Sequence, residues 1–207
     1  MALVAILPSA CANLERSRDT ANPNVSGQVL AQQVCSNCHG VTGNSRSPEF
    51  PNLAAQREAY LVAQLSGFKA HTREDPPGTE YMWGLSHNLT DKQIKEVAAY
   101  FSTQKLLPEP LEGKPERIEA GRAIFKDGIP DKAVPGCGSC HGPQGLGNAG
   151  DGPRIAGQHS HYLIKQLAVF QKTNQRPEGA AMKVVAHNLS AENMKNVAAF
   201  VQAMPNL

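Results

Sequence analysis

Two cysteine pairs, each followed at once by a histidine, offer the clearest chemistry in this sequence. They read Cys35-Ser-Asn-Cys38-His39 and Cys137-Gly-Ser-Cys140-His141. A Cys-x-x-Cys-His run is typical of c-type haem attachment. Lying early in a helix, the two thiols would form thioethers with one haem, and the imidazole that follows would bind its iron. We therefore predict two covalent haem c groups, attached through Cys35, Cys38, Cys137 and Cys140, with His39 and His141 as axial ligands.

Two other interpretations of the cysteine pairs are a thioredoxin-like redox pair and a zinc ribbon. A redox pair needs neither the following histidine nor a second copy. A ribbon usually spaces its pairs by about 15–20 residues, whereas 98 residues lie between Cys38 and Cys137. The odd total of five cysteines also argues against a simple disulfide framework. Haem attachment accounts for both pairs and both histidines.

Each iron needs a second axial ligand, for which the chain offers two duplicated candidates. Met82 corresponds to Met182, and they lie 43 and 41 residues after the predicted histidine ligands. His87 corresponds to His187 in the same way. Methionine raises the reduction potential relative to a second histidine, and a polar residue beside a helix cap has ordinary surface uses. The residues alone favour methionine, carried on a loop over the haem face, and leave bis-histidine ligation open.

The remaining methionines and histidines have weaker claims. Met194 aligns with Ile94 in an apolar helical stripe, so we expect it in the core. Met204 aligns with a glutamine and has no counterpart in the repeat. The histidines without counterparts are expected in solvent: His71, His159 and His161.

An internal repeat organises the chain. An offset of 102 residues relates the pairs Cys35 and Cys137, Pro51 and Pro153, Gln56 and Gln158, Tyr60 and Tyr162, and Gln64 and Gln166. Prolines 108, 110 and 115 between the copies suit an extended linker. We predict a signal remnant or flexible N-terminus over 1–23, a first domain over 24–107, a linker over 108–115 and a second domain over 116–207.

Both copies show helical rather than strand periodicity. Thr90 and Gln93 form a capping box before apolar residues at helical spacing, Ile94, Val97, Ala98 and Phe101. Ser190 caps the matching stripe in the second copy. A middle helix is expected over 60–68, with its counterpart over 162–170. No stretch alternates like a strand, so we predict an all-α protein.

The composition and the first residues of the chain limit the partners and the cellular compartment that we expect. A net charge of +2 gives no reason to expect nucleic acid as a partner, and no apolar run approaches the roughly 20 residues of a membrane span. The start of the chain, apolar to Leu7 and then rich in small residues, resembles the end of a secretory signal. Lipidation at Cys11 is the less favoured alternative, because Pro8 stands where a lipobox usually has leucine.

The order of motifs resembles the cytochrome c4 family. From about Val25 to Ala203 the chain twice shows Cys-x-x-Cys-His-Gly, Pro-x-(Leu/Ile)-Ala-x-Gln, Tyr-Leu-x-x-Gln-Leu, and a methionine followed by Asn-Leu-(Thr/Ser). The resemblance implies two tandem cytochrome c-like domains, related by internal duplication and packed about a pseudo-twofold axis. It also implies a periplasmic dihaem electron carrier rather than an enzyme.

The same resemblance bears on the ligands. In the family the ligating methionine lies seven residues before the leucine that precedes the last helix. Met82 and Met182 keep this spacing to Leu89 and Leu189, which favours His/Met ligation in both domains. The family also has a proline whose carbonyl accepts a hydrogen bond from the proximal histidine, a role that falls on Pro51 and Pro153.

The chain departs from the family pattern in several places. Histidines 87 and 187 stand where small residues are common, and the stretch before Cys137 is about eight residues longer than in the first copy. Trp83 follows the first methionine whereas Lys183 follows the second. We therefore expect unequal surroundings for the two haems.

Partners follow from the resemblance. It suggests a quinol-oxidising complex as electron donor and a terminal haem–copper oxidase as acceptor, with peripheral membrane association possible. Two alternatives remain: a haem subunit of a dehydrogenase complex, or a dihaem enzyme such as a peroxidase. An enzyme of that kind needs an open or displaceable iron site.

Overall fold

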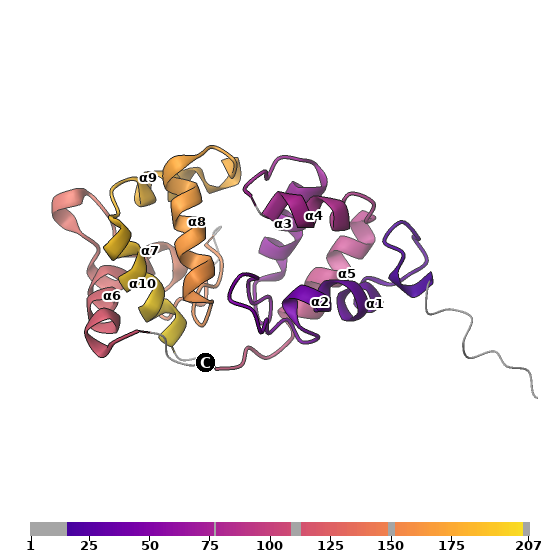
Figure 1. Cartoon of the computed structure of the whole chain (residues 1–207), viewed down its shortest axis with the longest axis horizontal. Coiled ribbons are helices and arrows are strands. Elements are labelled where there is room, and N and C mark those ends of the chain that lie inside the picture. Colours follow the sequence, from indigo (N-terminus) through magenta and orange to yellow (C-terminus); the bar gives the residue numbers. More distant parts are fainter. Residues whose placement is uncertain (1–15, 77, 109–112, 149–151, 205–207) are drawn as a thin grey trace, which may run out of the picture.

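The computed structural model describes residues 16–76, 78–108, 113–148 and 152–204. Within these ranges the chain forms two helical domains side by side, the first from indigo to pink and the second from rose-red through orange to yellow (Figure 1). The described residues contain no strand, and Ile129 and Val134 form an isolated bridge. The all-α prediction is confirmed.

The first domain is built on three longer helices and a helical run that ends at the first cysteine motif. A short turn, η1 (Arg16–Arg18), precedes them. In chain order the elements are α1 (Gly27–Leu30), η2 (Ala31–Cys35), α2 (Ser36–His39), α3 (Glu58–Lys69), α4 (Gly78–Ser86) and α5 (Asp91–Ser102).

The second domain repeats this plan with a longer connection before its motif. Its elements are α6 (Pro115–Asp127), η3 (Pro130–Lys132), α7 (Gly138–His141), α8 (Ser160–Lys172), η4 (Pro177–Gly179), α9 (Ala180–His187) and α10 (Ala191–Ala203). The extra residues before the second cysteine pair form η3 and the isolated bridge.

Capping boxes start the last helix of each domain as predicted. The Thr90 hydroxyl accepts from the Gln93 N–H at 3.2 Å, and the Gln93 side chain accepts from the Thr90 N–H at 2.9 Å. Ser190 and Asn193 repeat the arrangement. Two backbone donors at each helix start are thereby satisfied, which fixes where α5 and α10 begin.

Each domain has an apolar core between its first and last helices. The predicted stripe of α5 is buried against Leu30, Leu61 and Leu89. In the second domain α10 packs on α6, with Phe125, Val201 and other apolar residues in one cluster. Met194 is buried, as expected.

Glycine allows the first and last helices to cross closely. A β-carbon at Gly121 would overlap the carbonyl oxygen of Asn196, and one at Gly27 would overlap that of Gln93. The two glycines correspond in the repeat, so both domains use the same close crossing. This crossing fixes the helix that leads toward each cysteine motif.

Parts of the predicted segmentation lie outside the described residues. Cys11 and the rest of 1–15 are among them, as are residues 109–112 of the linker. Pro115, assigned to the linker, is the first residue of α6, which suits a residue that lacks a backbone N–H. The domain limits themselves stay a prediction.

Candidate functional site

The first cysteine motif lies at the end of a helical run, not early in a helix as expected. Cys35 is the last residue of η2, and Cys38 and His39 close α2. Gly40 ends the run with a φ of 75°, a conformation that glycine adopts without strain. The thiols are one helical turn apart, so both can reach one flat cofactor.

The second motif has the same geometry on a shorter element. Cys137 caps α7, Cys140 and His141 lie within it, and Gly142 ends it with a φ of 80°. Burial raises the pKa of Cys35 and of Cys137 to about 11. A thioredoxin-like redox pair requires the opposite shift, toward the thiolate. The redox-pair alternative therefore finds no support in either domain.

Each motif histidine donates to the carbonyl that the family resemblance assigned to it. The Nδ1 atom of His39 lies 2.9 Å from the Pro51 oxygen, and that of His141 lies 2.9 Å from the Pro153 oxygen. Because a carbonyl only accepts, each Nδ1 carries the proton. The neutral ring then has its lone pair on Nε2, where a metal can bind.

Both histidines are buried, with 7% of each residue exposed. Burial lowers the pKa of His39 and of His141, and the hydrogen bond to the proline carbonyl opposes the shift. The rings are therefore held neutral, which is the form that ligates a metal.

The two candidate methionines lie on helices, which corrects the expectation of a loop. Met82 is on α4 and Met182 on α9, and both side chains are half-buried. Phe50 connects α4 to the first motif: its ring centroid is 6.1 Å from that of His39 and 6.3 Å from that of Tyr81. The helix that carries Met82 thus lies against the surroundings of His39.

Phe50 was missed by the sequence analysis. Its counterpart in the second copy is Gly152, and that of Tyr81 is Ala181. Comparison of the two copies could not single out a residue that only one of them has. The two sites therefore differ beside the histidine as well as beside the methionine.

The rival histidine ligands face solvent. His87 is exposed, with its Nδ1 atom 3.1 Å from the carbonyl oxygens of Trp83 and Gly84. Its ring stacks on that of Trp83 at 4.9 Å. His187 is exposed at the end of α9.

One prediction about the unpaired histidines is wrong. His159 is buried, with 4% of the residue exposed, and its Nε2 atom lies 3.2 Å from the Ser45 carbonyl oxygen in the other domain. The sequence gives no sign of this contact because it joins segments 114 residues apart. His71 and His161 are exposed as expected, and His161 pairs with Glu49 at 2.7 Å.

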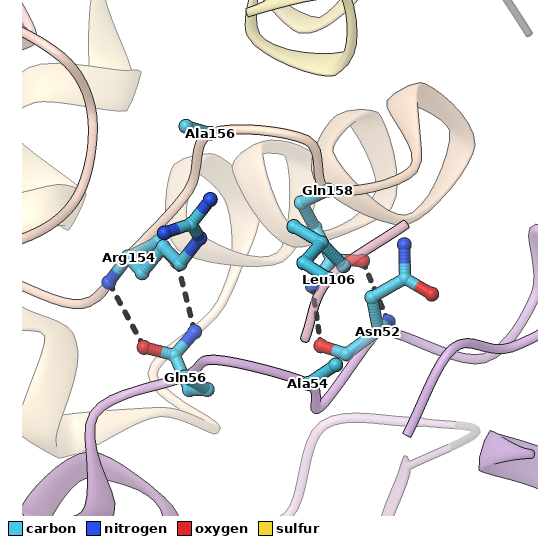
Figure 2. A pocket seen from close by; sticks show the side chains of 7 residues that line it. All are labelled: Asn52, Ala54, Gln56, Leu106, Arg154, Ala156 and Gln158. Carbon is cyan, nitrogen blue, oxygen red and sulfur yellow. Dashed lines mark hydrogen bonds between the residues drawn. The ribbon is translucent and has the colours of Figure 1, made fainter. Parts of the chain in front are cut away.

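The loops that hold the two histidines meet at the domain junction. The Gln56 side chain accepts from the Arg154 N–H at 2.9 Å and donates to the Arg154 carbonyl at 2.8 Å. Gln158 forms the same pair of bonds with Asn52, at 2.8 and 2.9 Å. Figure 2 shows the two pairs side by side around a cavity of about 10 Å³, the size of one water. The repeat pairs Gln56 with Gln158 in the sequence but does not predict this role.

A second buried network joins α3 and α8. Asp75 accepts from Arg73 at 2.7 Å and from Gln166 of the other domain at 3.1 Å. Arg176 of the second domain donates to Gln64 of the first at 2.8 Å. The network holds the domains together through charged groups that are shielded from water.

The residues at these sites fit haem c. The buried Nε atom of Arg154 has no hydrogen-bond partner among the described residues, and burial lowers the pKa of this guanidinium. Haem carries two carboxylates, and a group of that kind would supply the missing partner. Free thiols at the right spacing and a neutral imidazole meet its other needs.

Two further observations concern metal ions and membranes. In the described part of the chain, no three histidine, cysteine, aspartate or glutamate side chains gather as they would around a metal ion. None of the helices described is both long and apolar enough to cross a membrane.

Comparisons with known proteins extend over both copies of the repeat. A family model described as Cytochrome c matches residues 25–105 and 118–205. Cytochrome c4 from Azotobacter vinelandii is 35% identical over 197 residues, which cover 89% of this chain and 93% of that protein. The crystal structure of reduced recombinant cytochrome c4 from Pseudomonas stutzeri has a TM-score of 0.77 at 34% identity, covering 86% of this chain and 97% of that chain. A thiosulfate dehydrogenase electron acceptor from Stutzerimonas stutzeri (strain A1501) is 30% identical over 180 residues, covering 84% of this chain and 80% of that protein.

Proposed function

Since this chain belongs to the cytochrome c4 family, we propose that it carries electrons between redox proteins of the periplasm through two His/Met-ligated haems. It is a dihaem electron carrier, with one covalent haem c at each Cys-x-x-Cys-His motif. When bound, each haem supplies an iron that takes up and releases one electron. The proposed domains are 24–107 and 116–207, joined by 108–115.

One observation carries the proposal: the same 2.9 Å hydrogen bond orients the motif histidine in both domains. Pro51 and Pro153 hold the proton on Nδ1 and leave Nε2 of His39 and His141 to the iron. The thiols of Cys35, Cys38, Cys137 and Cys140 anchor the two haems. In this role the proline carbonyls also make the imidazoles better ligands.

Met82 and Met182 complete the two iron sites in this proposal. Both are half-buried on corresponding helices, whereas the competing histidines are exposed. The ring of His87 stacks on that of Trp83, with the ring centroids 4.9 Å apart. With a histidine and a methionine to hold each iron, the protein would leave neither iron open to a substrate, as a carrier requires.

The periplasmic location and the partners rest on the resemblance and on the attachment chemistry, which belongs to an exported compartment. We propose a quinol-oxidising complex as donor and a terminal haem–copper oxidase as acceptor. Peripheral association with the membrane would bring the carrier to both.

Absorption spectra of the purified holoprotein, with and without carbon monoxide, test the ligation. We expect two low-spin haems, the weak methionine-to-iron charge-transfer band and no response to carbon monoxide. Met82→Leu and Met182→Leu should each remove about half of that band and open one iron to carbon monoxide. His87→Leu, directly after the helix that carries Met82, is the matched control and should change neither. Carbon monoxide binding by the wild-type protein would contradict the carrier mechanism.

A second candidate is electron acceptor of a thiosulfate dehydrogenase, which is favoured by the 30% identity to a protein of that name. Stopped-flow reduction by a thiosulfate dehydrogenase plus thiosulfate separates the candidates. Reduction as fast as that by a quinol-oxidising complex supports this partner, and reduction only over minutes excludes it.

A further inference from the structure

The peptide group between Pro51 and Asn52 belongs to two hydrogen bonds that point in opposite directions. Its carbonyl accepts from Nδ1 of His39 at 2.9 Å. Its N–H donates at 2.8 Å to the side-chain oxygen of Gln158, a residue of the second domain. One peptide therefore connects the predicted iron ligand of one domain to a side chain of the other.

The peptide between Pro153 and Arg154 makes the corresponding two hydrogen bonds, with the roles of the two domains exchanged. Its carbonyl accepts from Nδ1 of His141 at 2.9 Å, and its N–H donates to the side-chain oxygen of Gln56 at 2.9 Å. The connection is thus crossed, because each glutamine contacts the peptide that holds the histidine of the other domain (Figure 2).

Both glutamines are fixed in the orientation that this connection needs. Each is buried, with 7% of the residue exposed. Each amide nitrogen donates to a carbonyl of the opposite loop, from Gln158 to Asn52 at 2.9 Å and from Gln56 to Arg154 at 2.8 Å. A flipped amide would place two acceptors together and two donors together. The oxygen is therefore held toward the peptide N–H.

Hydrogen bonds arranged in such a chain polarise one another. When the peptide N–H donates to glutamine, its carbonyl becomes a better acceptor for the histidine N–H. A stronger bond at Nδ1 makes the imidazole a more basic ligand, and a more basic ligand stabilises the oxidised iron more than the reduced iron. Loss of the glutamine should therefore raise the reduction potential.

We infer that each glutamine tunes the haem of the opposite domain: Gln158 acts on the haem bound to His39, and Gln56 on the haem bound to His141. The inference rests on the proposed ligation by these histidines. Both glutamines are positioning residues, since they act through a peptide and touch no cofactor atom. Each reduction potential then depends on the docking of the two domains.

Redox titrations of Gln158→Leu and Gln56→Leu test the crossing. The two haems are followed separately by NMR of their methyl groups. For Gln158→Leu we expect the equilibrium constant for reduction of the first haem to rise about two- to tenfold, in line with roughly 10–30% strengthening per bond in a hydrogen-bonded chain. The second haem should stay unchanged. For Gln56→Leu we expect the same rise for the second haem and no change for the first.

Lys165→Met is the matched control, because it removes a contact across the same junction, to Glu49 at 2.7 Å, without touching either peptide. It should shift neither haem. A shift of the haem in the glutamine's own domain, equal shifts of both, or no shift would each overturn the inference. If the leucine variants do not fold, Gln158→Asn and Gln56→Asn keep the amide but are one methylene too short to reach both backbone atoms. The same shifts are expected.

Failure of the inference is distinguishable from failure of the proposed function. Unchanged reduction potentials in glutamine variants that keep the charge-transfer band would contradict the inference and leave the proposed His/Met ligation intact. Carbon monoxide binding by the wild-type protein would contradict the proposed ligation, independently of the reduction potentials.

Discussion

Phe50 makes the first site differ from the second at the level of a single side chain. Its ring lies between those of His39 and Tyr81, so it joins the loop after the cysteine motif to helix α4. The second domain has glycine in this place. Aromatic rings thereby connect the helix that carries Met82 to the His39 site, and the second domain has Gly152 and Ala181 at the corresponding positions.

We expect Phe50→Ala to weaken methionine ligation in the first domain only. The side chain is half-buried, so the loss of stability should be about 2 kcal/mol, below the roughly 3–5 kcal/mol of a fully buried phenylalanine. Thermal loss of the charge-transfer band, followed for each haem, measures the effect. Tyr81→Leu should produce a smaller change of the same kind. Equal weakening in both domains would contradict this account.

Helices α6 and α10 depend on a glycine for their distance from each other. Gly121 leaves no room for a β-carbon beside Asn196, and α6 leads toward the second cysteine motif. The backbone of α6 thus approaches α10 closely at this point, in addition to the apolar side-chain contacts between the two helices.

Gly121→Ala should destabilise the second domain by about 1–3 kcal/mol, the usual cost of an overpacked core. Calorimetric unfolding of the holoprotein measures this change. Gly84→Ala is the control, since a β-carbon there meets nothing within 4 Å. It should be neutral or stabilising by roughly 0.5–1 kcal/mol. Equal destabilisation by both substitutions would contradict the crowding argument, because only Gly121 has a close neighbour.

Local patterns predicted these elements well, and they failed where distant segments meet. The capping residues Thr90 and Ser190 and the stripe of α5 act within one helix, so their effect is readable from spacing. The burial of His159 and the pairing of Gln56 with Arg154 depend on how two domains dock. Spacing within either copy carries no information about that docking. The helical setting of Met82 was missed because α4 spans only nine residues, Gly78–Ser86.

At the scale of the whole molecule, buried charges bind the two domains into one unit. Asp75 has no exposed surface and touches Arg73 of its own domain and Gln166 of the other. In the second domain Glu178 makes a similar pair with Arg176, at 3.0 Å, but is partly exposed. The junction therefore depends more on the acid of the first copy than on that of the second.

Asp75→Asn should destabilise the protein by about 3–5 kcal/mol, because it leaves the buried guanidinium of Arg73 without a carboxylate. We expect one calorimetric transition for the wild type and two separated transitions for the variant, as the domains lose their coupling. Glu178→Gln is the matched control and should cost under about 1 kcal/mol. A single transition in the Asp75 variant would mean that the domains are coupled elsewhere.

The crossed glutamines also have an evolutionary consequence. The side chain of Gln56 accepts from the backbone N–H of residue 154, and that of Gln158 accepts from the backbone N–H of residue 52. Two identical chains related by an exact twofold axis would form both hydrogen bonds equally well. A single-domain ancestor could have made them as a homodimer before its gene was duplicated and fused. After fusion, a change in either copy alters the site of its sister, so the two halves must diverge together.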